Sequence, residues 1–351
     1  SIFSHSPWWP YYGVVEDYFG RLSLALTQGK PVRDVLVIHN VESGWGACFR
    51  AGKQELLTEL DDGLAKLTRT LSDQHYDWDF ADESLLASHG QVNTKGIKVG
   101  RLTYKLAIVP PSVTLRKTTV DLLAELLARG GSVLFVGRRP TLVDSEPGEA
   151  IDKLVAAARC CDDVGAATAA IEPVLARRVS ITQDGRQQTC IWSMLRKLDH
   201  GQLLFVQSHD RAAGHRLHLD VAGHEPVVLW DARTGERTRV ESAVAGKGGG
   251  ARVSFDLDLP PTGSALLSLG MDVPEAVEPA PAPVVTAKTA LPGPFEIQPA
   301  EPNTMPLDYC RYSFADEPFS DDVPVLKADA EIRARFGLAP RIGREQQPWC
   351  L

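Results

Sequence analysis

Apolar positions in the first half of the chain alternate between helical spacing and short continuous runs. Residues 11–29 have helical spacing, which Gly29 and Pro31 bring to an end. Residues 34–39 are nearly all apolar, as in parallel strands buried on both faces. The alternation continues and predicts, in chain order, a helix through 56–71, a strand at 76–80, a helix at 84–88, a strand at 104–110, a helix at 116–129, a strand at 131–137 and a helix at 148–158. Such crossovers give an open parallel sheet with helices on both faces, so we predict a flavodoxin-like α/β domain over residues 30–165.

The second half of the chain has the period of antiparallel strands. Residues 189–198 and 202–208 flank the turn sequence Asp-His-Gly, which is a strong hairpin signal. Residues 216–221 and 252–259 alternate between polar and apolar side chains, as half-exposed strands do. We therefore expect the α/β domain to be followed by a small antiparallel β-sandwich over residues 166–272.

The remainder of the chain changes composition again. Residues 273–294 are rich in Pro, Ala and Val and predict an extended, semi-rigid linker. A strand at 307–312 and a helix at 328–336 indicate the start of a further β-domain over 295–351, whose remainder is absent from the sequence. Because the chain begins with Ser1 and stops at Leu351 without a polar tail, we expect it to be a piece of a longer polypeptide.

Composition narrows the range of partners. The chain has 351 residues, 44% of them hydrophobic, which is enough for two or three separate cores. Its formal net charge of -8 argues against nucleic acid as a partner. No apolar run approaches the roughly 18 residues that would indicate a membrane span.

None of the six cysteines has C-x-x-C spacing, so neither a zinc ribbon nor a dithiol redox motif is expected, and we predict no cofactor. The compartment cannot be read from the sequence, although the cytoplasm is slightly favoured.

Loops that bind nucleotides or carry a nucleophile are missing. The segment Asn40–Gly46 after the first predicted strand has two glycines but neither G-x-G-x-x-G nor a P-loop. Gly246–Gly250 resembles a phosphate loop only in composition and is expected to be a flexible hairpin loop. Glutaminase chemistry needs a cysteine on a tight strand-to-helix turn, and Ser112 occupies the corresponding region without flanking glycines. A serine near a helix start is more typical of a helix cap than of a nucleophile.

Histidines cluster between residues 209 and 224 and raise the question of a metal site. His215 and His218 are separated by an odd number of positions, so on a strand they point to opposite faces and cannot share one ion. All four histidines, His209, His215, His218 and His224, are better interpreted as polar surface positions on a hairpin. We therefore predict no metal site.

Four carboxylates fall within seven residues, at what the pattern predicts to be the carboxyl end of a strand. They are Asp77, Asp79, Asp82 and Glu83. Cleavage of a glycosidic bond requires a pair of carboxyl groups, which makes these four weak catalytic candidates. The start of a helix also favours Asp and Glu, because they accept hydrogen bonds from free amides there. We prefer this structural interpretation.

Aromatic residues are concentrated just before the first predicted helix. The segment from His5 to Tyr12 contains Trp8 and Trp9 as well. Aromatic faces stack on sugar rings, so these residues are candidates for the rim of a carbohydrate site. An equally good interpretation is a hydrophobic anchor that holds the helix against a neighbouring domain.

The order of several segments resembles the region that follows the catalytic barrel in large alpha-L-rhamnosidase-like glycoside hydrolases of the family 106 type. The segments are Ser6–Tyr12, Tyr18–Leu24, Gln28–Val35, Tyr76–Phe80, Tyr104–Pro110, Gly130–Leu134, Val227–Gly235, Leu259–Leu266, Leu307–Tyr312 and Gln347–Trp349. The resemblance implies that residues 1–29 are the end of a barrel or a linking helix, and that the acid and base glutamates lie upstream of Ser1. The α/β part is also similar to the trimerisation domain of family 42 beta-galactosidases, which has the class I glutamine amidotransferase fold without its chemistry.

The leading hypothesis is therefore a non-catalytic scaffold and carbohydrate-contacting segment of a glycoside hydrolase. Its expected partners are a carbohydrate substrate, the upstream barrel and the downstream β-domain of the same polypeptide, and, in a homo-oligomer, further copies of itself. Two alternatives stay open, namely a stand-alone assembly or carbohydrate-binding module and a divergent amidotransferase-like enzyme.

Overall fold

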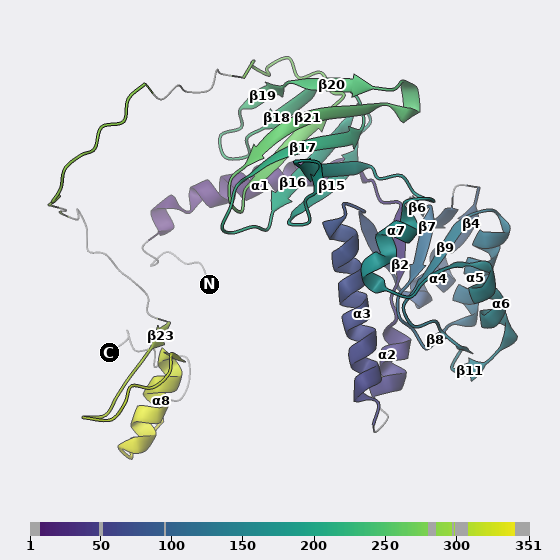
Figure 1. Cartoon of the computed structure of the whole chain (residues 1–351), viewed down its shortest axis with the longest axis horizontal. Coiled ribbons are helices and arrows are strands. Elements are labelled where there is room, and N and C mark those ends of the chain that lie inside the picture. The colour runs from purple at the N-terminus through teal and green to yellow at the C-terminus, as the bar shows by residue number, and fades with distance from the viewer. Residues whose placement is uncertain are drawn as a thin grey trace. The chain divides into compact units, whose positions relative to one another are not determined.

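The computed structural model describes residues 8–48, 52–94, 96–279, 286–296, 298 and 308–340. The chain forms two compact units, a larger one over residues 11–282 and a smaller one that combines residues 1–10 and 283–351. The larger unit contains a parallel sheet with helices and a set of antiparallel sheets (Figure 1). The mixed α/β plus β architecture expected from the sequence is thus present. Among the described helices, none is long and apolar enough to cross a membrane.

Five parallel strands form the sheet of the α/β layer in the order β3-β2-β7-β9-β12. Their bounds are β2 Val35–Ile38, β3 Trp78–Ala81, β7 Leu106–Val109, β9 Ser132–Val136 and β12 Arg159–Cys161. The strands β2 and β7 are buried on both faces, which explains their continuous apolar sequence. Chain order along the sheet is therefore 2-1-3-4-5, and each crossover carries a helix.

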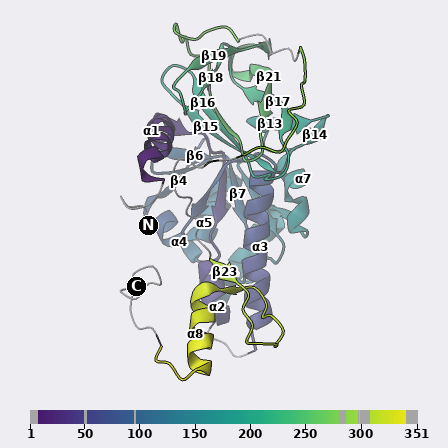
Figure 2. The same cartoon turned by 90° about the vertical axis from the view of Figure 1, so that its left-hand side faces the viewer.

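Helices cover both faces of this sheet (Figures 1 and 2). The helices are α2 Val41–Cys48, α3 Gln54–Asp73, α4 Glu83–His89, α5 Lys117–Ala128, α6 Glu149–Ala157 and α7 Ala167–Ile171, the last preceded by the short helix η2 Val164–Ala166. One core joins α4, α5 and α6 to the sheet through residues such as Leu86, Leu123 and Ile151. The other joins α3 and α7 through Leu67 and Ile171. Two separate apolar layers therefore stabilise the sheet.

The region between β3 and β7 departs from the sequence-based prediction. A three-stranded antiparallel sheet is formed by β4 Gly90–Asn93, β5 Gly96–Val99 and β6 Leu102–Tyr104, of which only Tyr104 was predicted to be in a strand. The strand predicted at 104–110 is divided at Lys105, whose backbone amide donates to the carbonyl oxygen of Asp34 at 2.8 Å. A second small sheet combines β8 Thr114–Leu115, β10 Leu142–Val143 and β11 Glu146–Pro147.

Two antiparallel sheets share the core of the sandwich. One sheet has the order β1-β15-β16-β22-β18-β19, with bounds β1 Lys30–Pro31, β15 Ile191–Lys197, β16 Gln202–Ser208, β22 Ser264–Leu269, β18 Val227–Trp230 and β19 Arg237–Val240. The other has the order β14-β13-β17-β21-β20, with bounds β14 Arg186–Gln187, β13 Val179–Gln183, β17 His215–Ala222, β21 Arg252–Leu259 and β20 Ser242–Ala245. The predicted hairpin and the two alternating strands are confirmed. Gly246–Gly250 connects β20 to β21 and contains the short helix η3 Gly248–Gly250.

The segment before the parallel sheet packs on the sandwich. The helix α1 Gly13–Thr27 lies beside the sandwich (Figure 2), and the Tyr18 and Ser264 hydroxyls are 2.7 Å apart. Arg21 donates to the carbonyl oxygens of Ala232 and Arg233 at 3.1 and 2.9 Å. The following strand β1 pairs with the edge strand β15, so the chain contributes to the sandwich before it enters the α/β layer.

The ends of the described chain complete the picture. The start of the predicted linker continues the sandwich, because Val273 is buried and Val277 forms a bridge with Thr238. In the smaller unit, β23 Tyr309–Cys310 pairs with β24 Val323–Pro324, and α8 Val325–Arg335 follows. The short helix η1 Trp9–Tyr11 precedes α1. Leu307 and the segment Gln347–Trp349 lie outside the described residues.

Candidate functional site

Asp77 and Asp79 are held by one guanidinium group. Arg33 Nε lies 3.2 Å from Asp77 Oδ1, and Arg33 Nη1 lies 2.5 Å from Asp79 Oδ1. The hydroxyl of Tyr104 donates to the other oxygen of Asp79 at 2.8 Å. We call these four residues the Arg33 clamp. The clamp brings together one residue from the β1–β2 connection, two from the start of β3 and one from β6.

The predicted position of these two carboxylates at the carboxyl end of a strand is wrong. Parallel pairing of Val35 with Trp78 makes β3 begin after Asp77, so Asp77 stands at the amino end and Asp79 within the strand. Ligands in open α/β sheets bind outside the carboxyl ends of the strands. The clamp is therefore at the other edge of the sheet.

Burial and the Arg33 cation have opposite effects on the pKa of Asp77. Burial raises the pKa of Asp77 to about 6, although Arg33 and the backbone amide of Trp78 favour its ionised form. Its second oxygen, Oδ2, is buried and has no hydrogen-bond partner among the described residues. Burial and the neighbouring Asp79 carboxylate raise the pKa of the Tyr104 hydroxyl above its usual range. The clamp thus confines two carboxylates that the fold has partly removed from water.

Replacement of Asp77 by asparagine is expected to change how stability depends on pH. Since the folded-state pKa is above the ordinary value, Asp77 stabilises the fold below about pH 4, and that contribution is lost as the pH rises through about 6. Relative to Asp77→Asn, the natural protein should lose about 2 kcal/mol of unfolding free energy between pH 4 and pH 7.5. Urea unfolding at both pH values measures this, with the exposed-site variant Asp256→Asn as control. A constant difference between Asp77→Asn and the natural protein would contradict it.

Asp82 and Glu83 lie at the opposite end of β3 and begin α4. Asp82 accepts hydrogen bonds from the amides of Ser84 and Leu85 at 2.8 and 3.0 Å, which is the geometry of an N-cap. Its hydrogen bond from the Ser84 hydroxyl, with help from these amides, lowers the pKa of Asp82. Glu83 is only 2% exposed and accepts from the amide of Arg116 at 2.8 Å, and burial raises its pKa. Both side chains have the structural partners that a helix start supplies.

The carboxyl edge of the parallel sheet is filled by side chains that bond to the backbone. Asn40 Nδ2 donates to the carbonyl oxygen of Pro111 at 2.7 Å, and Ser43 accepts from the amides of Val113 and Thr114. The fully buried Ser112 donates to the carbonyl oxygen of Pro110 at 2.8 Å. Ser112 precedes β8 rather than a helix, so its interpretation as a helix cap is wrong. It is not an exposed nucleophile either, since it is buried.

The aromatic candidates are distributed over both units. Trp8 and Trp9 belong to the smaller unit and are about half exposed, at 53% and 45%. Tyr12 and the four carboxylates belong to the larger unit, where Tyr12 precedes α1 and is half-buried. His5 lies outside the described residues.

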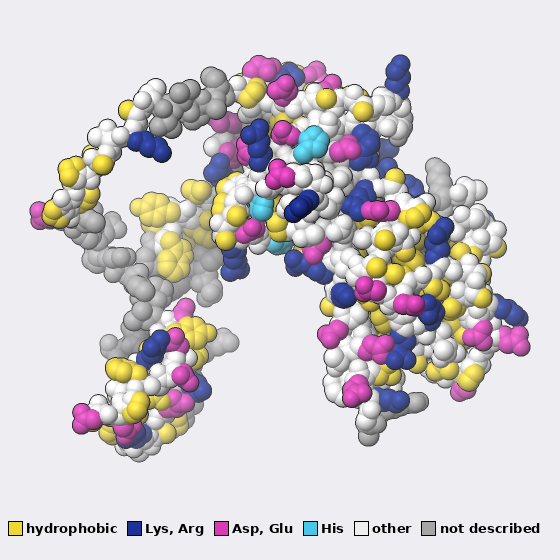
Figure 3. Space-filling view, in the orientation of Figure 1, with side chains coloured by type: hydrophobic (Ala, Val, Ile, Leu, Met, Phe, Trp, Pro, Cys, Tyr) yellow, Lys and Arg dark blue, Asp and Glu magenta, His cyan; other side chains and the backbone are white. Residues whose placement is uncertain are grey.

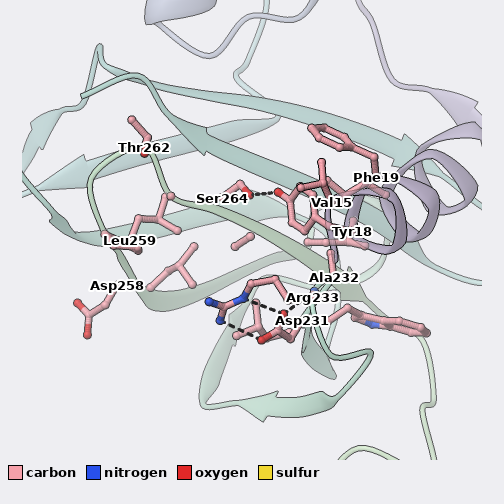
Figure 4. A pocket seen from close by; sticks show the side chains of 18 of the residues that line it. Val15, Tyr18, Phe19, Asp231, Ala232, Arg233, Asp258, Leu259, Thr262 and Ser264 are labelled. Atoms are coloured by element: carbon pink, nitrogen blue, oxygen red, sulfur yellow. Dashed lines mark hydrogen bonds and ion pairs between the residues drawn. The ribbon is translucent and has the colours of Figure 1, made fainter. Parts of the chain in front are cut away.

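A groove between α1 and the sandwich was not predicted. It is lined on one side by α1 and on the other by β18, β22, the end of β21 and two turns (Figure 4). Val15, Tyr18 and Phe19 form its apolar wall, while Asp231 and Arg233 pair with each other at 3.1 Å on the opposite side. Three of the segments that carry the resemblance, Tyr18–Leu24, Val227–Gly235 and Leu259–Leu266, meet here. That these three segments take part in the resemblance was the only signal in the sequence that pointed to them.

Aromatic and apolar side chains beside a few polar groups can bind the apolar face of a sugar or another polypeptide segment. Within the groove, Tyr18 is bonded to Ser264, and Asp231 is bonded to Arg233. Asp258 is the other carboxylate that lines it. The groove therefore offers a binding surface. None of its described contacts pairs Asp231 with Asp258 as an acid and a base.

The histidines do not form one group. His215 and His218 point to opposite faces of β17, as expected, since His215 contacts Cys190 and Asp210 whereas His218 pairs with Asp256. His209 packs against Trp192 with ring centroids 4.2 Å apart. The grouping of Cys190, Asp210 and His215 was missed, because the three residues come from separate strand ends.

Comparisons with known proteins place the fold. No protein-family model and no curated protein matches this sequence. Among solved structures, a rhamnosidase from Novosphingobium sp. PP1Y is similar with a TM-score of 0.56 and 18% identity, over 79% of this chain and 26% of that one. A beta-galactosidase from Bacillus circulans sp. alkalophilus matches with a TM-score of 0.51 and 11% identity, over 76% of this chain and 46% of that one. A catalytic mutant of a GH42 beta-galactosidase from G. stearothermophilus matches with a TM-score of 0.52 and 9% identity, over 76% of this chain and 44% of that one.

About three quarters of this chain therefore shares its fold with parts of these three glycoside hydrolase structures. This chain spans about a quarter of the rhamnosidase and less than half of each beta-galactosidase.

Proposed function

We propose that this chain is a non-catalytic scaffold and carbohydrate-contacting segment of a glycoside hydrolase of the alpha-L-rhamnosidase type, as in family 106. The observation that carries the proposal is that both edges of the parallel sheet are already occupied. At the carboxyl edge, Asn40, Ser43 and Ser112 bond to backbone groups. At the amino edge, the Arg33 clamp holds Asp77 and Asp79.

The sheet order 2-1-3-4-5 supports the finer assignment of a flavodoxin-like, class I amidotransferase-like layer. That fold performs glutaminase chemistry only with an exposed nucleophile on the turn after a strand. Ser112 is fully buried in that region, which disfavours the amidotransferase alternative. The layer is better suited to hold other parts of an enzyme in place.

The scaffold role is supported by the surface of α1. Leu22 is the only buried residue of this helix, while Val14, Phe19 and Leu24 are 67%, 58% and 69% exposed. Val14 and Phe19 line the groove, and exposed apolar side chains of this kind mark surfaces that contact another part of a protein or a ligand. We assign these exposed side chains of α1, together with the groove, to contact with a catalytic barrel of the same polypeptide or with carbohydrate.

Charge distribution is consistent with such partners. Basic and acidic side chains are interspersed over the larger unit on the face that Figure 3 shows. Together with the net charge of -8, this disfavours a nucleic-acid partner. A stand-alone assembly module is the second candidate, because the exposed face of α1 would also suit a further copy of this chain.

Hydrolysis of p-nitrophenyl alpha-L-rhamnoside tests the catalytic part of the proposal. The 351-residue chain is expected to release no nitrophenol above the background rate, whereas a full-length polypeptide that includes the barrel is expected to be active. Asp79→Asn and the matched Asp256→Asn variant should leave that full-length activity unchanged within about twofold, provided that both fold. Hydrolysis by the short chain that Asp79→Asn abolishes would overturn the proposal. A full-length polypeptide without a barrel would favour the assembly module.

A further inference from the structure

Three potential metal ligands converge at one end of the sandwich. Cys190 precedes β15, Asp210 follows β16 and His215 begins β17. Cys190 Sγ lies 3.6 Å from His215 Nε2, and His215 Nε2 lies 3.1 Å from Asp210 Oδ2. All three ligand atoms lie within 4.8 Å of one another, and each residue is half-buried.

The sulfur–nitrogen and nitrogen–oxygen separations fit a tetrahedral zinc site. Zinc binds thiolate at about 2.3 Å and imidazole or carboxylate at about 2.0 to 2.1 Å, so neighbouring ligands of a tetrahedral ion are about 3.6 Å apart for sulfur and nitrogen and about 3.3 Å for nitrogen and oxygen. The observed 3.6 and 3.1 Å agree closely with these values. Cys190 Sγ and Asp210 Oδ2 both approach the same ring nitrogen, His215 Nε2.

The surrounding contacts orient the ligands. Asp210 Oδ1 accepts from the amides of Ala212 and Ala213 at 2.8 and 3.1 Å, which leaves Oδ2 directed at His215. The other ring nitrogen of His215, Nδ1, lies 3.1 Å from Gln183 Oε1. When Nδ1 carries the proton and donates it to Gln183, the lone pair of Nε2 is available to an ion; without an ion, Nε2 contacts the Asp210 carboxylate. Metal-bound histidines usually make such a hydrogen bond through their second nitrogen.

The backbone holds the three strand ends together. The amide of His209 donates to the carbonyl oxygen of Cys190 at 2.8 Å, and the amide of Thr262 donates to that of Asp210 at 2.8 Å. Rigid strand ends keep the ligand atoms close without a bound ion.

The geometry points to a binding site for zinc or a similar divalent cation, with Cys190, Asp210 and His215 as ligands and a fourth position left for water. Mixed sulfur, nitrogen and oxygen donors in tetrahedral arrangement suit zinc rather than magnesium or calcium. The site is distant in sequence from the Arg33 clamp, and it does not depend on the proposed function.

Cobalt(II) titration of the chelator-treated 351-residue chain tests the site, because thiolate ligation of cobalt gives a charge-transfer absorption in the near ultraviolet. We expect one cobalt per chain with that absorption, and its displacement by zinc. Cys190→Ser should abolish the absorption, and Gln183→Leu should weaken binding by about 10- to 100-fold through loss of the orienting hydrogen bond. The matched controls His218→Asn and Cys161→Ser should bind as the natural chain does.

Circular dichroism shows whether each variant retains the sandwich. If Cys190→Ser does not fold, Asp210→Asn replaces it, since an asparagine still accepts from Ala212 and Ala213 but is a much weaker ligand. Loss of tight binding in Asp210→Asn would then support the site. Absence of the thiolate absorption in the natural chain, or its persistence in a folded Cys190→Ser variant, would overturn it.

Discussion

Replacement of Arg33 by methionine is expected to lower the free energy of unfolding by about 3 kcal/mol at pH 8, and by about 1 kcal/mol at pH 5. Methionine keeps the length and apolar packing of the arginine stem but removes the cation between Asp77 and Asp79. Those side chains are only 27% and 25% exposed, so two ionised carboxylates would be left together with little water. At pH 5 a proton on Asp77 relieves the repulsion, because burial already raises the pKa of Asp77 to about 6.

Urea unfolding followed by tryptophan fluorescence measures this change, since Trp78 adjoins the clamp. The double variant Arg33→Met with Asp77→Asn should recover at least half of the lost unfolding free energy at pH 8, because it removes one of the two carboxylates that Arg33→Met leaves unpaired. Arg33→Lys is the conservative control, which keeps the charge but loses the two-pronged contact. A loss that is the same at pH 5 and pH 8 would show that Arg33 acts through packing alone.

Residues at the amino edge of the parallel sheet contact the sandwich, which gives this edge a structural role. At the amino edge, Arg33 follows β1, which is itself an edge strand of the sandwich. His75, also at this edge, is buried and contacts the carbonyl oxygen of Ile191 at 2.8 Å; burial lowers its pKa to about 4, so it is neutral near pH 7. Trp192 donates to Asp73 at 2.8 Å across the same boundary. These contacts join the α/β layer to the sandwich as one unit.

Much of this fold could be predicted from the sequence where burial on both faces dictates the pattern. Val35–Ile38 and Ser132–Val136 are almost fully buried, and a short continuous apolar run is typical of a strand that is covered on both sides. The sheet β4–β6 was missed because its strands are short and largely polar: Ile97 and Tyr104 are buried there, whereas Lys98 is exposed. Such a sequence resembles a loop until its partners are known.

The candidate site was harder to predict, for a different physical reason. The type of residue at Asp77 and Asp79 suggested catalysis, but their partner Arg33 lies 44 and 46 positions away. Only the register of β2 against β3 brings these groups together. The same applies to Cys190 and Asp210, which meet because β15 and β16 form a hairpin. Chemistry assembled across strands is not visible in local spacing.

The second large effect on stability is expected at Asp34, which joins the α/β layer to the sandwich. Asp34 is the residue before β2, its side chain is 11% exposed, and its two oxygens lie 2.7 Å from Arg178 Nε and 3.0 Å from Lys105 Nζ. Burial alone would raise the pKa of Asp34, but Arg178 and Lys105 lower it further than burial raises it. The ionised carboxylate is therefore stabilised by folding, and that contribution is present above about pH 4 and lost as the pH falls through the lowered pKa.

Asp34→Ala is expected to lower the free energy of unfolding by about 2 to 3 kcal/mol at pH 7, because Arg178 stands next to β13 and the variant breaks the ion pair between the sandwich and the parallel sheet. The loss stays below that of a fully buried pair, since Arg178 and Lys105 are 41% and 47% exposed and can recover water. Asp256→Ala, which removes an exposed partner of His218, should change stability by less than about 0.5 kcal/mol. Hydrogen exchange should also accelerate in β2 and β13 of Asp34→Ala relative to the middle of β16. Equal effects of Asp34→Ala and Asp256→Ala would mean that Asp34 does not join the two layers, and that packing around His75 and Trp192 does so instead.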